Sequence, residues 1–125
     1  NYPPNGVIDK TSQNLDLWDR IRDLKYADFF IGLGSGLSWL SWAVGTYSFL
    51  ISGFSKPFCE FQSNVTRIHN SNVCNGCFND QDVPYNLDDW MWCPRLKGTP
   101  DMFECTRSIK PEQVISEIKT YLNNM

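Results

Sequence analysis

Four of the five cysteines have the spacing of a metal-binding set: Cys74, Cys77, Cys93 and Cys105. A Cys-x2-Cys turn such as Cys74–Cys77 brings two thiolates within reach of one ion, and Gly76 lets the backbone turn tightly. The other two cysteines follow after intervals of 15 and 11 residues and can close the shell. Because four sulfur ligands leave no open coordination position, we expect one structural ion, either iron or zinc.

The cysteine count argues against a disulfide framework, because five is odd and the Cys-x2-Cys spacing is typical of a metal knuckle. We therefore expect a reducing compartment, the cytoplasm. An iron–sulfur cluster fits less well, since the spacing matches none of the usual cluster patterns. Cys59, between aromatic residues, is expected to be a small buried hydrophobe, and His69 to have a surface or core role.

A second chemical feature is the turn formed by Gly34, Ser35, Gly36 and Leu37. An apolar run at 28–33 predicts a buried strand before it, and residues 37–44 have no helix breaker. A second β-rich run at 46–52 completes a strand–turn–helix–strand order, which predicts a parallel sheet. Such a turn presents free N–H groups and a helix dipole to an anion, typically a phosphate. It is neither a Walker loop nor a full dinucleotide fingerprint.

The remaining elements must support these two features. A helix is expected from a cap at Ser12 or Asn14 to about Tyr26, and another from Pro111 to about Leu122. Residues 57–108 are expected to be irregular and to depend on the metal, as a subregion of a single domain spanning 1–125.

The tryptophans are expected to pack inside the protein. Trp39 and Trp42 lie three residues apart and should pack their helix onto the sheet, whereas Trp90 and Trp92 should shield the metal site. The acidic pair Asp88 and Asp89 is expected to lie in a solvated loop.

Composition limits the partners. The net charge of −3 implies no basic surface for nucleic acid, and no apolar run is long enough to cross a membrane. The chain opens with Asn1 and lacks an initiator Met, so we expect a fragment of a longer protein.

Several of these motifs resemble the bacterial autotransporter heptosyltransferases, which are GT-B glycosyltransferases related to the lipopolysaccharide heptosyltransferases. The resemblance covers roughly residues 5–122, and the cysteine block is its most specific part. The segments that carry it are 31–45, 49–55, 74–80, 90–94 and 104–105.

This resemblance implies a Rossmann-like α/β domain, the C-terminal half of a GT-B fold, with an irregular four-cysteine insertion that holds iron. It implies that Gly34–Leu37 faces the diphosphate of a nucleotide sugar, ADP-heptose, and that an adhesin is the protein acceptor. The catalytic residue and the acceptor site would lie in an N-terminal domain outside this chain, and a homo-oligomer is left open. The wider heptosyltransferase family has Asp and His where this chain has Gly34 and Trp39, so their roles do not carry over.

Two other functions compete with this interpretation. The first is a non-catalytic, metal-stapled α/β interaction module. The second is a redox protein that uses Cys74 and Cys77, although this Cys-x-x-Cys is not at a strand–helix junction.

Overall fold

The computed structural model describes residues 3–125, so residues 1 and 2 at the chain opening lie outside the described range. Its centre is a three-stranded parallel sheet of β1 (Phe30–Leu33), β2 (Ser48–Ile51) and β3 (Val65–Ile68), in the order β1-β2-β3. Ile31 lies opposite Phe49, and Phe49 lies opposite Thr66. The predicted parallel βαβ unit is therefore confirmed.

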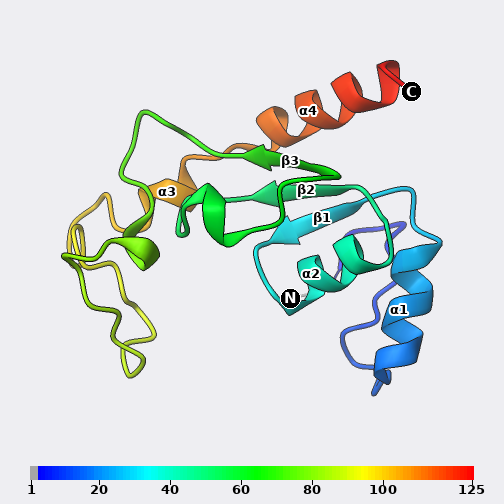
Figure 1. Cartoon of the computed structure of the whole chain (residues 1–125), viewed down its shortest axis with the longest axis horizontal. Coiled ribbons are helices and arrows are strands. Elements are labelled where there is room, and N and C mark those ends of the chain that lie inside the picture. Colours follow the sequence, from blue (N-terminus) through cyan, green and yellow to red (C-terminus); the bar gives the residue numbers. More distant parts are fainter. Residues whose placement is uncertain (1–2) are drawn as a thin grey trace.

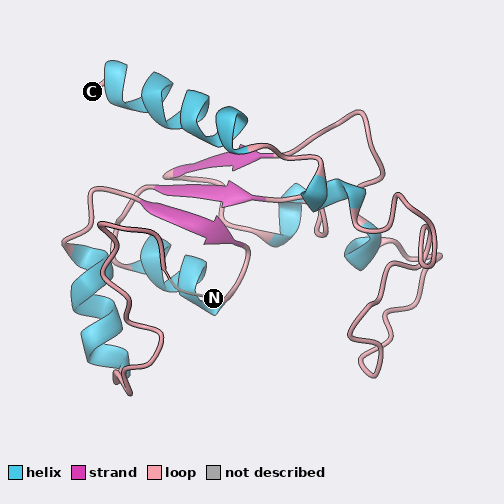
Figure 2. Cartoon of the chain, turned by 180° about the vertical axis from the view of Figure 1, so that it is seen from behind, coloured by secondary structure: helices cyan, strands magenta, loops and turns pink. Residues whose placement is uncertain are grey.

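The helices lie on both sides of this sheet (Figure 1). Helices α1 (Leu17–Lys25) and α2 (Gly36–Ala43) lie on one side, and α4 (Pro111–Asn123) lies on the other. Figure 2 shows the same separation from behind. Short helical turns η1 (Pro57–Cys59), η2 (Cys77–Asn79) and α3 (Glu104–Arg107) interrupt the long connections. No helix within residues 3–125 is long and apolar enough to cross a membrane.

The long connections gather beyond the carboxyl ends of the strands, toward which the arrowheads in Figure 1 point. We call residues 74–105, which contain all four candidate metal ligands, the cysteine lobe. Strand β3 precedes this lobe and lies inside the stretch 57–108 that was expected to be irregular. The sequence did not reveal β3 because Val65–Ile68 contains two polar residues and lies between polar turns, whereas β1 and β2 lie in longer apolar runs.

Helix boundaries are close to the predictions, with one correction at a cap. Helix α1 begins at Leu17, and the carboxylate of Asp16 accepts the N–H of Asp19 at 2.8 Å. The predicted caps at Ser12 and Asn14 are therefore wrong: Asp16, placed directly before the helix, provides the capping oxygen. Pro111 does occupy the first turn of α4, and Gly45 follows α2 with φ +85°.

The face of α2 that meets the sheet is made of serines. Ser38 and Ser41 are fully buried, and the Ser48 hydroxyl donates to the Ser41 hydroxyl at 3.2 Å. Small side chains let the helix backbone approach β2 closely. The prediction that Trp39 and Trp42 form this contact is wrong, since they are 44% and 39% exposed. Trp42 stacks on Phe61 at the flank of the helix, and Trp39 packs edge-on against the same ring.

The apolar core is formed by the central strand and its neighbours. Phe49 and Leu50 on β2 are fully buried, and Ile68 on β3 is 1% exposed. The Phe49 ring packs edge-on against Phe29 of the loop before β1 and Tyr121 of α4. This packing joins α4 to the central strand and to the segment that enters β1.

A matched pair of substitutions tests whether β3 belongs to the core. Ile68→Ala should lower the free energy of unfolding of this domain by about 2–5 kcal/mol, because it leaves a cavity in a packed interior. Ile8→Ala removes the same atoms from a side chain that is 82% exposed and should change it by less than about 0.5 kcal/mol. Urea unfolding of both variants measures the difference, and equal effects would contradict the placement of β3.

Candidate donor site and cysteine lobe

The glycine turn lies at the carboxyl end of β1, as predicted. Strand β1 ends at Leu33, and α2 begins at Gly36. The Ser35 N–H donates to the Ser38 hydroxyl at 2.9 Å, and that hydroxyl donates to the Ser35 carbonyl at 2.7 Å. This local pair fixes the entry into the helix. The N–H groups of Gly36 and Leu37 in the first turn of α2 have no intrahelical acceptor, so they are available to an anion.

The space in front of the turn is open. A Cβ added at Gly36 would meet nothing within 4 Å. A cavity of about 370 Å³ lies there and is lined by Gly34, Ser35, Gly36, Trp39, Phe54, Ser55, Cys59, Glu60 and Phe78. A smaller cavity of about 190 Å³ adjoins the ends of β1 and β2. Both cavities lie where open α/β sheets bind ligands, outside the carboxyl ends of the strands.

Glu60 is a site residue that sequence reasoning missed. Its side chain is 6% exposed and lies 2.8 Å from Arg67, measured from Oε2 to Nε. Neither of these two atoms has a well-aligned hydrogen bond, so the contact is an ion pair. The Ser55 hydroxyl donates to Glu60 Oε1 at 2.7 Å. No pattern in the sequence marks Glu60, because its partners lie five and seven residues away in an irregular stretch.

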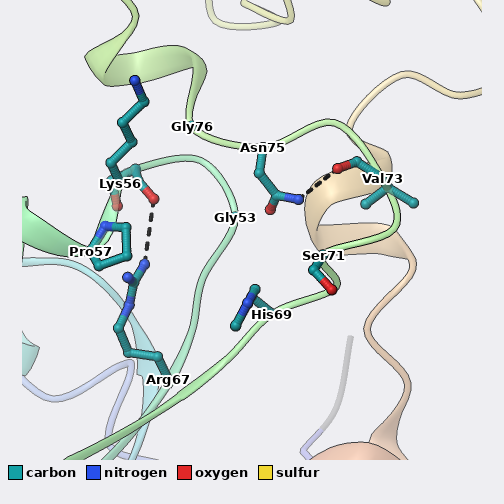
Figure 3. Close-up of a pocket in the computed structure, with 10 residues that line it drawn as sticks. Gly53, Lys56, Pro57, Arg67, His69, Ser71, Val73, Asn75 and Gly76 are labelled. Atoms are coloured by element: carbon teal, nitrogen blue, oxygen red, sulfur yellow. Dashed lines mark hydrogen bonds between the residues drawn. The ribbon is translucent and has the colours of Figure 1, made fainter.

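A further cavity, of about 360 Å³, lies on the other side of the loop that follows β2 (Figure 3). Arg67 and His69 point toward it from β3 and the residue after it, and the Arg67 guanidinium donates to the Ser55 carbonyl at 3.4 Å. His69 is exposed, which agrees with the expected surface role. Arg67 therefore borders this cavity and pairs with the acid that lines the other two.

The structure places Cys74 and Cys77 close together. Their Sγ atoms are 3.9 Å apart, and all five cysteines are free. Two ligands of a tetrahedral ion with bonds of about 2.3 Å would be about 3.8 Å apart. Cys77 and Cys93 are 8% exposed, and Cys74 and Cys105 are half-buried. A disulfide between Cys74 and Cys77 is excluded by this separation.

The sulfur atoms influence one another electrostatically. Burial, together with the neighbouring Cys74 and Cys105, raises the pKa of Cys77 to about 11. Burial also raises the pKa of Cys105, with Cys93 and Cys74 adding to the effect. All four cysteines of the predicted set therefore lie in one neighbourhood. Even so, no group of three or more His, Cys, Asp or Glu side chains in residues 3–125 is arranged to hold a metal ion.

The chemistry of the lobe fits an ion bound by sulfur. The Phe103 N–H points at Cys93 Sγ at 3.4 Å, and Arg95 Nη1 points at Cys74 Sγ at 3.5 Å. Donors of this kind stabilise thiolate charge. The donor set is thus suited to iron or zinc, while the closed four-sulfur shell is not confirmed.

Two expectations about this region are corrected by the structure. Trp92 is buried at 8% exposure, but Trp90 is 97% exposed and shields nothing. Trp90 lies at the tip of a turn, where its neighbours cannot cover it. Cys59 is half-buried and lines the cavity at the glycine turn, so it is not a fully buried hydrophobe.

The cysteine lobe is joined to the loop after β2 by backbone contacts. The Gly76 N–H donates to the Gly53 carbonyl at 2.7 Å, and the Phe78 N–H donates to the Phe54 carbonyl at 3.1 Å. Gly76 has φ +74°, which the tight turn requires. Phe54 and Gly53 also line the cavities beside the glycine turn. The two candidate sites therefore share one wall.

Comparison with known proteins supports the resemblance inferred from the sequence. The chain is 48% identical over 114 residues to the autotransporter heptosyltransferase BAHTCr of Citrobacter rodentium, covering 91% of this chain and 27% of the relative. It is 46% identical over 127 residues to the autotransporter heptosyltransferase Aah of Escherichia coli, covering 99% of this chain and 32% of that relative. An inactive autotransporter heptosyltransferase, BimC of Burkholderia thailandensis, is 42% identical over 128 residues, covering 94% and 30%. No family model matches the chain.

Solved structures agree with these relatives. The iron-containing dodecameric glycosyltransferase TibC from enterotoxigenic E. coli matches with a TM-score of 0.90 and 44% identity, covering 99% of this chain and 32% of that one. The heptosyltransferase TibC in complex with ADP-D-beta-D-heptose matches with a TM-score of 0.82 and 46% identity, covering 88% and 29%. The resemblance to the autotransporter heptosyltransferases is thus confirmed, and the chain spans about a third of the length of these relatives.

The shared wall can be tested with two glycines. A Cβ at position 53 would lie 2.5 Å from the Cys105 carbonyl oxygen and 2.9 Å from the Cys105 Cβ. Gly53→Ala should therefore destabilise the domain by about 1–3 kcal/mol through overpacking and speed the alkylation of Cys77 and Cys93. Gly36→Ala, whose Cβ meets open space, should leave both measurements unchanged or raise stability. Equal alkylation rates in the two variants would show that the lobe does not rest on Gly53.

Proposed function

We propose that this chain is the nucleotide-sugar-binding part of a glycosyltransferase that transfers heptose from ADP-heptose to a bacterial autotransporter adhesin. The observation that carries this proposal is the open glycine turn at Gly34–Leu37, at the carboxyl end of β1 and in front of a cavity of about 370 Å³. Support comes from relatives named autotransporter heptosyltransferases and from a related structure described in complex with ADP-D-beta-D-heptose.

The diphosphate of the donor would meet the N-terminus of α2. The N–H groups of Gly36 and Leu37 are in its first turn, and the helix dipole favours negative charge there. With no side chain at Gly36, a phosphate oxygen can approach the backbone directly. In this account the chain's own residues bind and orient the donor, and they do not perform the transfer step.

The remaining parts of the enzyme would lie outside these residues. Strand β1 has a free edge in the described part of the chain, and its Ile31 and Leu33 are 43% and 58% exposed. We infer that residues 1–125 form the C-terminal, donor-binding domain of a GT-B fold and that the rest of the protein supplies the acceptor site and the catalytic residue. A relative named inactive shares this segment, which accords with chemistry carried elsewhere.

The cysteine lobe would hold one structural iron or zinc ion through Cys74, Cys77, Cys93 and Cys105. Iron is favoured by the related structures, which are described as iron-containing. The ion would supply a cross-link between three turns of the lobe and no step of the reaction. Reduced thiols at all five cysteines fit a cytoplasmic protein.

Self-association completes the proposal. TibC is described as dodecameric. In this chain Leu87 and Trp90 at the tip of the cysteine lobe are 83% and 97% exposed. Apolar surface of this kind favours burial in an assembly, so we place it at a contact between copies of the full-length protein.

A competing function is the metal-stapled interaction module without a sugar ligand. It shares the fold and the cysteine lobe but makes no use of the open turn. The two functions differ in one property, the binding of a nucleotide sugar to the full-length protein.

Gly36→Val in the full-length protein distinguishes the two functions. The added side chain enters open space, so the protein should fold, but its methyl groups occupy the place of a phosphate oxygen. We expect ADP-heptose affinity and transfer to fall by at least about 100-fold, as when an oriented phosphate contact is lost. Calorimetric titration measures the affinity. If a folded, metal-loaded variant kept its affinity for ADP-heptose, the result would favour the interaction module over the donor-binding function.

Metal analysis tests the cysteine lobe. The purified protein should contain about one iron or zinc per chain, and Cys93→Ser should lose the ion and the hydrogen-exchange protection of residues 74–105 while β1 and β2 stay protected. Cys59→Ser is the matched control and should retain both. A wild-type protein without metal, or a Cys93→Ser lobe that stays protected, would show that no ion holds this region together.

A further inference from the structure

The Glu60 carboxylate is the acidic group beside the glycine turn. It lines both the cavity of about 370 Å³ in front of the turn and the cavity of about 190 Å³ at the strand ends. Among the described residues that line these two cavities, Glu60 is the only acid. A buried carboxylate next to an anion-binding turn calls for a chemical reason, since two negative groups repel each other.

The geometry places this carboxylate in the side-chain space of residue 34. A Cβ added at Gly34 would lie 2.7 Å from Glu60 Oε1, so the carboxylate occupies the volume that a side chain there would fill. It therefore faces the cavity from the same side as the turn. A side chain at position 34 would have to displace the Glu60 carboxylate.

The hydrogen-bonding capacity of Glu60 is only partly used. Oε1 accepts one hydrogen bond, from the Ser55 hydroxyl at 2.7 Å. Oε2 lies 2.8 Å from Arg67 Nε but has no aligned hydrogen bond. Oε2 is buried against Arg67, so only Oε1 can face a ligand, and it keeps room for at least one further hydrogen bond. The positive charge of Arg67, 2.8 Å from Oε2, offsets the repulsion between this carboxylate and a nearby phosphate.

The unused capacity selects the class of ligand group. An ionised carboxylate accepts hydrogen bonds and donates none, so it binds hydroxyl or amine hydrogens and rejects phosphate oxygens. The first-turn N–H groups of α2 are donors and do the reverse. The cavity thus offers donors for a diphosphate and, beside them, an acceptor for the hydroxyls next to that diphosphate.

We propose that Glu60 accepts hydrogen bonds from sugar hydroxyls adjoining the donor diphosphate and so sets the preference of this site for a glycosylated diphosphate. This inference rests on the proposed donor site. A nucleotide sugar has a hydroxylated ring on each side of its diphosphate, the ribose and the transferred sugar. Both present the same chemistry to Glu60.

The test uses the full-length protein, the variant Glu60→Gln and three probes: inorganic pyrophosphate, ADP and ADP-heptose. Gln keeps the size of the side chain but loses the charge and one acceptor oxygen. We expect ADP-heptose affinity to fall about 10- to 100-fold, as for a hydrogen bond to a charged group. Pyrophosphate affinity should stay equal or rise, because a negative charge has been removed. Glu112→Gln, on the exposed start of α4, is the control and should change nothing.

The probes distinguish the two sugars. If ADP and ADP-heptose weaken equally, Glu60 binds the ribose; if only ADP-heptose weakens, it binds the transferred sugar. Unchanged affinity for both would overturn the inference. So would a parallel fall for pyrophosphate, because Glu60 would then only support the turn. If Glu60→Gln fails to fold, Glu60→Asp keeps the charge and withdraws the carboxylate by one methylene, with the same pattern expected.

The test of Glu60 can be distinguished from the test of the proposed donor site. If wild type binds ADP-heptose and Gly36→Val does not, the donor site stands whatever Glu60→Gln does. If wild type binds no ADP-heptose, both the donor site and the role of Glu60 are overturned.

Discussion

The loop after β2 is the constraint on which the rest of this structure depends. Its Gly53 and Phe54 carbonyls accept the N–H groups of Gly76 within the Cys74–Cys77 knuckle and of Phe78 directly after it, and Gly53 packs directly against Cys105. The same two residues line the cavities beside the glycine turn. The buried central strand fixes this backbone on one side and the cysteine lobe fixes it on the other, so its position shapes the cavity beside the glycine turn. The irregular lobe is thus part of the wall of the site.

Polar packing accounts for the position of α2 against the sheet. Serines on α2, and a serine on β2 that meets them, replace the large apolar residues usual between helix and sheet, so the helix lies close to the strand. The N-terminus of α2 is thereby held near the strand ends and near Glu60. Trp39 and Trp42 lie beside this helix–strand contact and form an aromatic cluster with Phe61. Glu60, paired with Arg67, then supplies a charged group to a cavity wall whose other lining residues are neutral.

Much of this arrangement follows from the sequence, and what does not has physical reasons. The parallel βαβ unit, the turn at Gly34–Leu37 and helix α4 are predicted, because glycine, proline and apolar runs act locally. Strand β3 is missed because its four residues include Thr66 and Arg67 and form no apolar run. The exposure of Trp90 is missed because nothing local shows whether tertiary neighbours cover an aromatic ring. Glu60 is missed since its role depends on Gly34, 26 positions earlier in the chain. The spacing of the cysteines predicts their proximity but not whether their sulfur atoms close around an ion.

The central claim is that the glycine turn receives the diphosphate of a nucleotide sugar within a cavity walled by the cysteine lobe. A crystal structure of the full-length protein with ADP-heptose tests it most directly. The account predicts diphosphate oxygens within about 3 Å of the Gly36 and Leu37 N–H groups, beyond the carboxyl end of β1. A diphosphate bound elsewhere, with Gly36 facing only solvent, would contradict it.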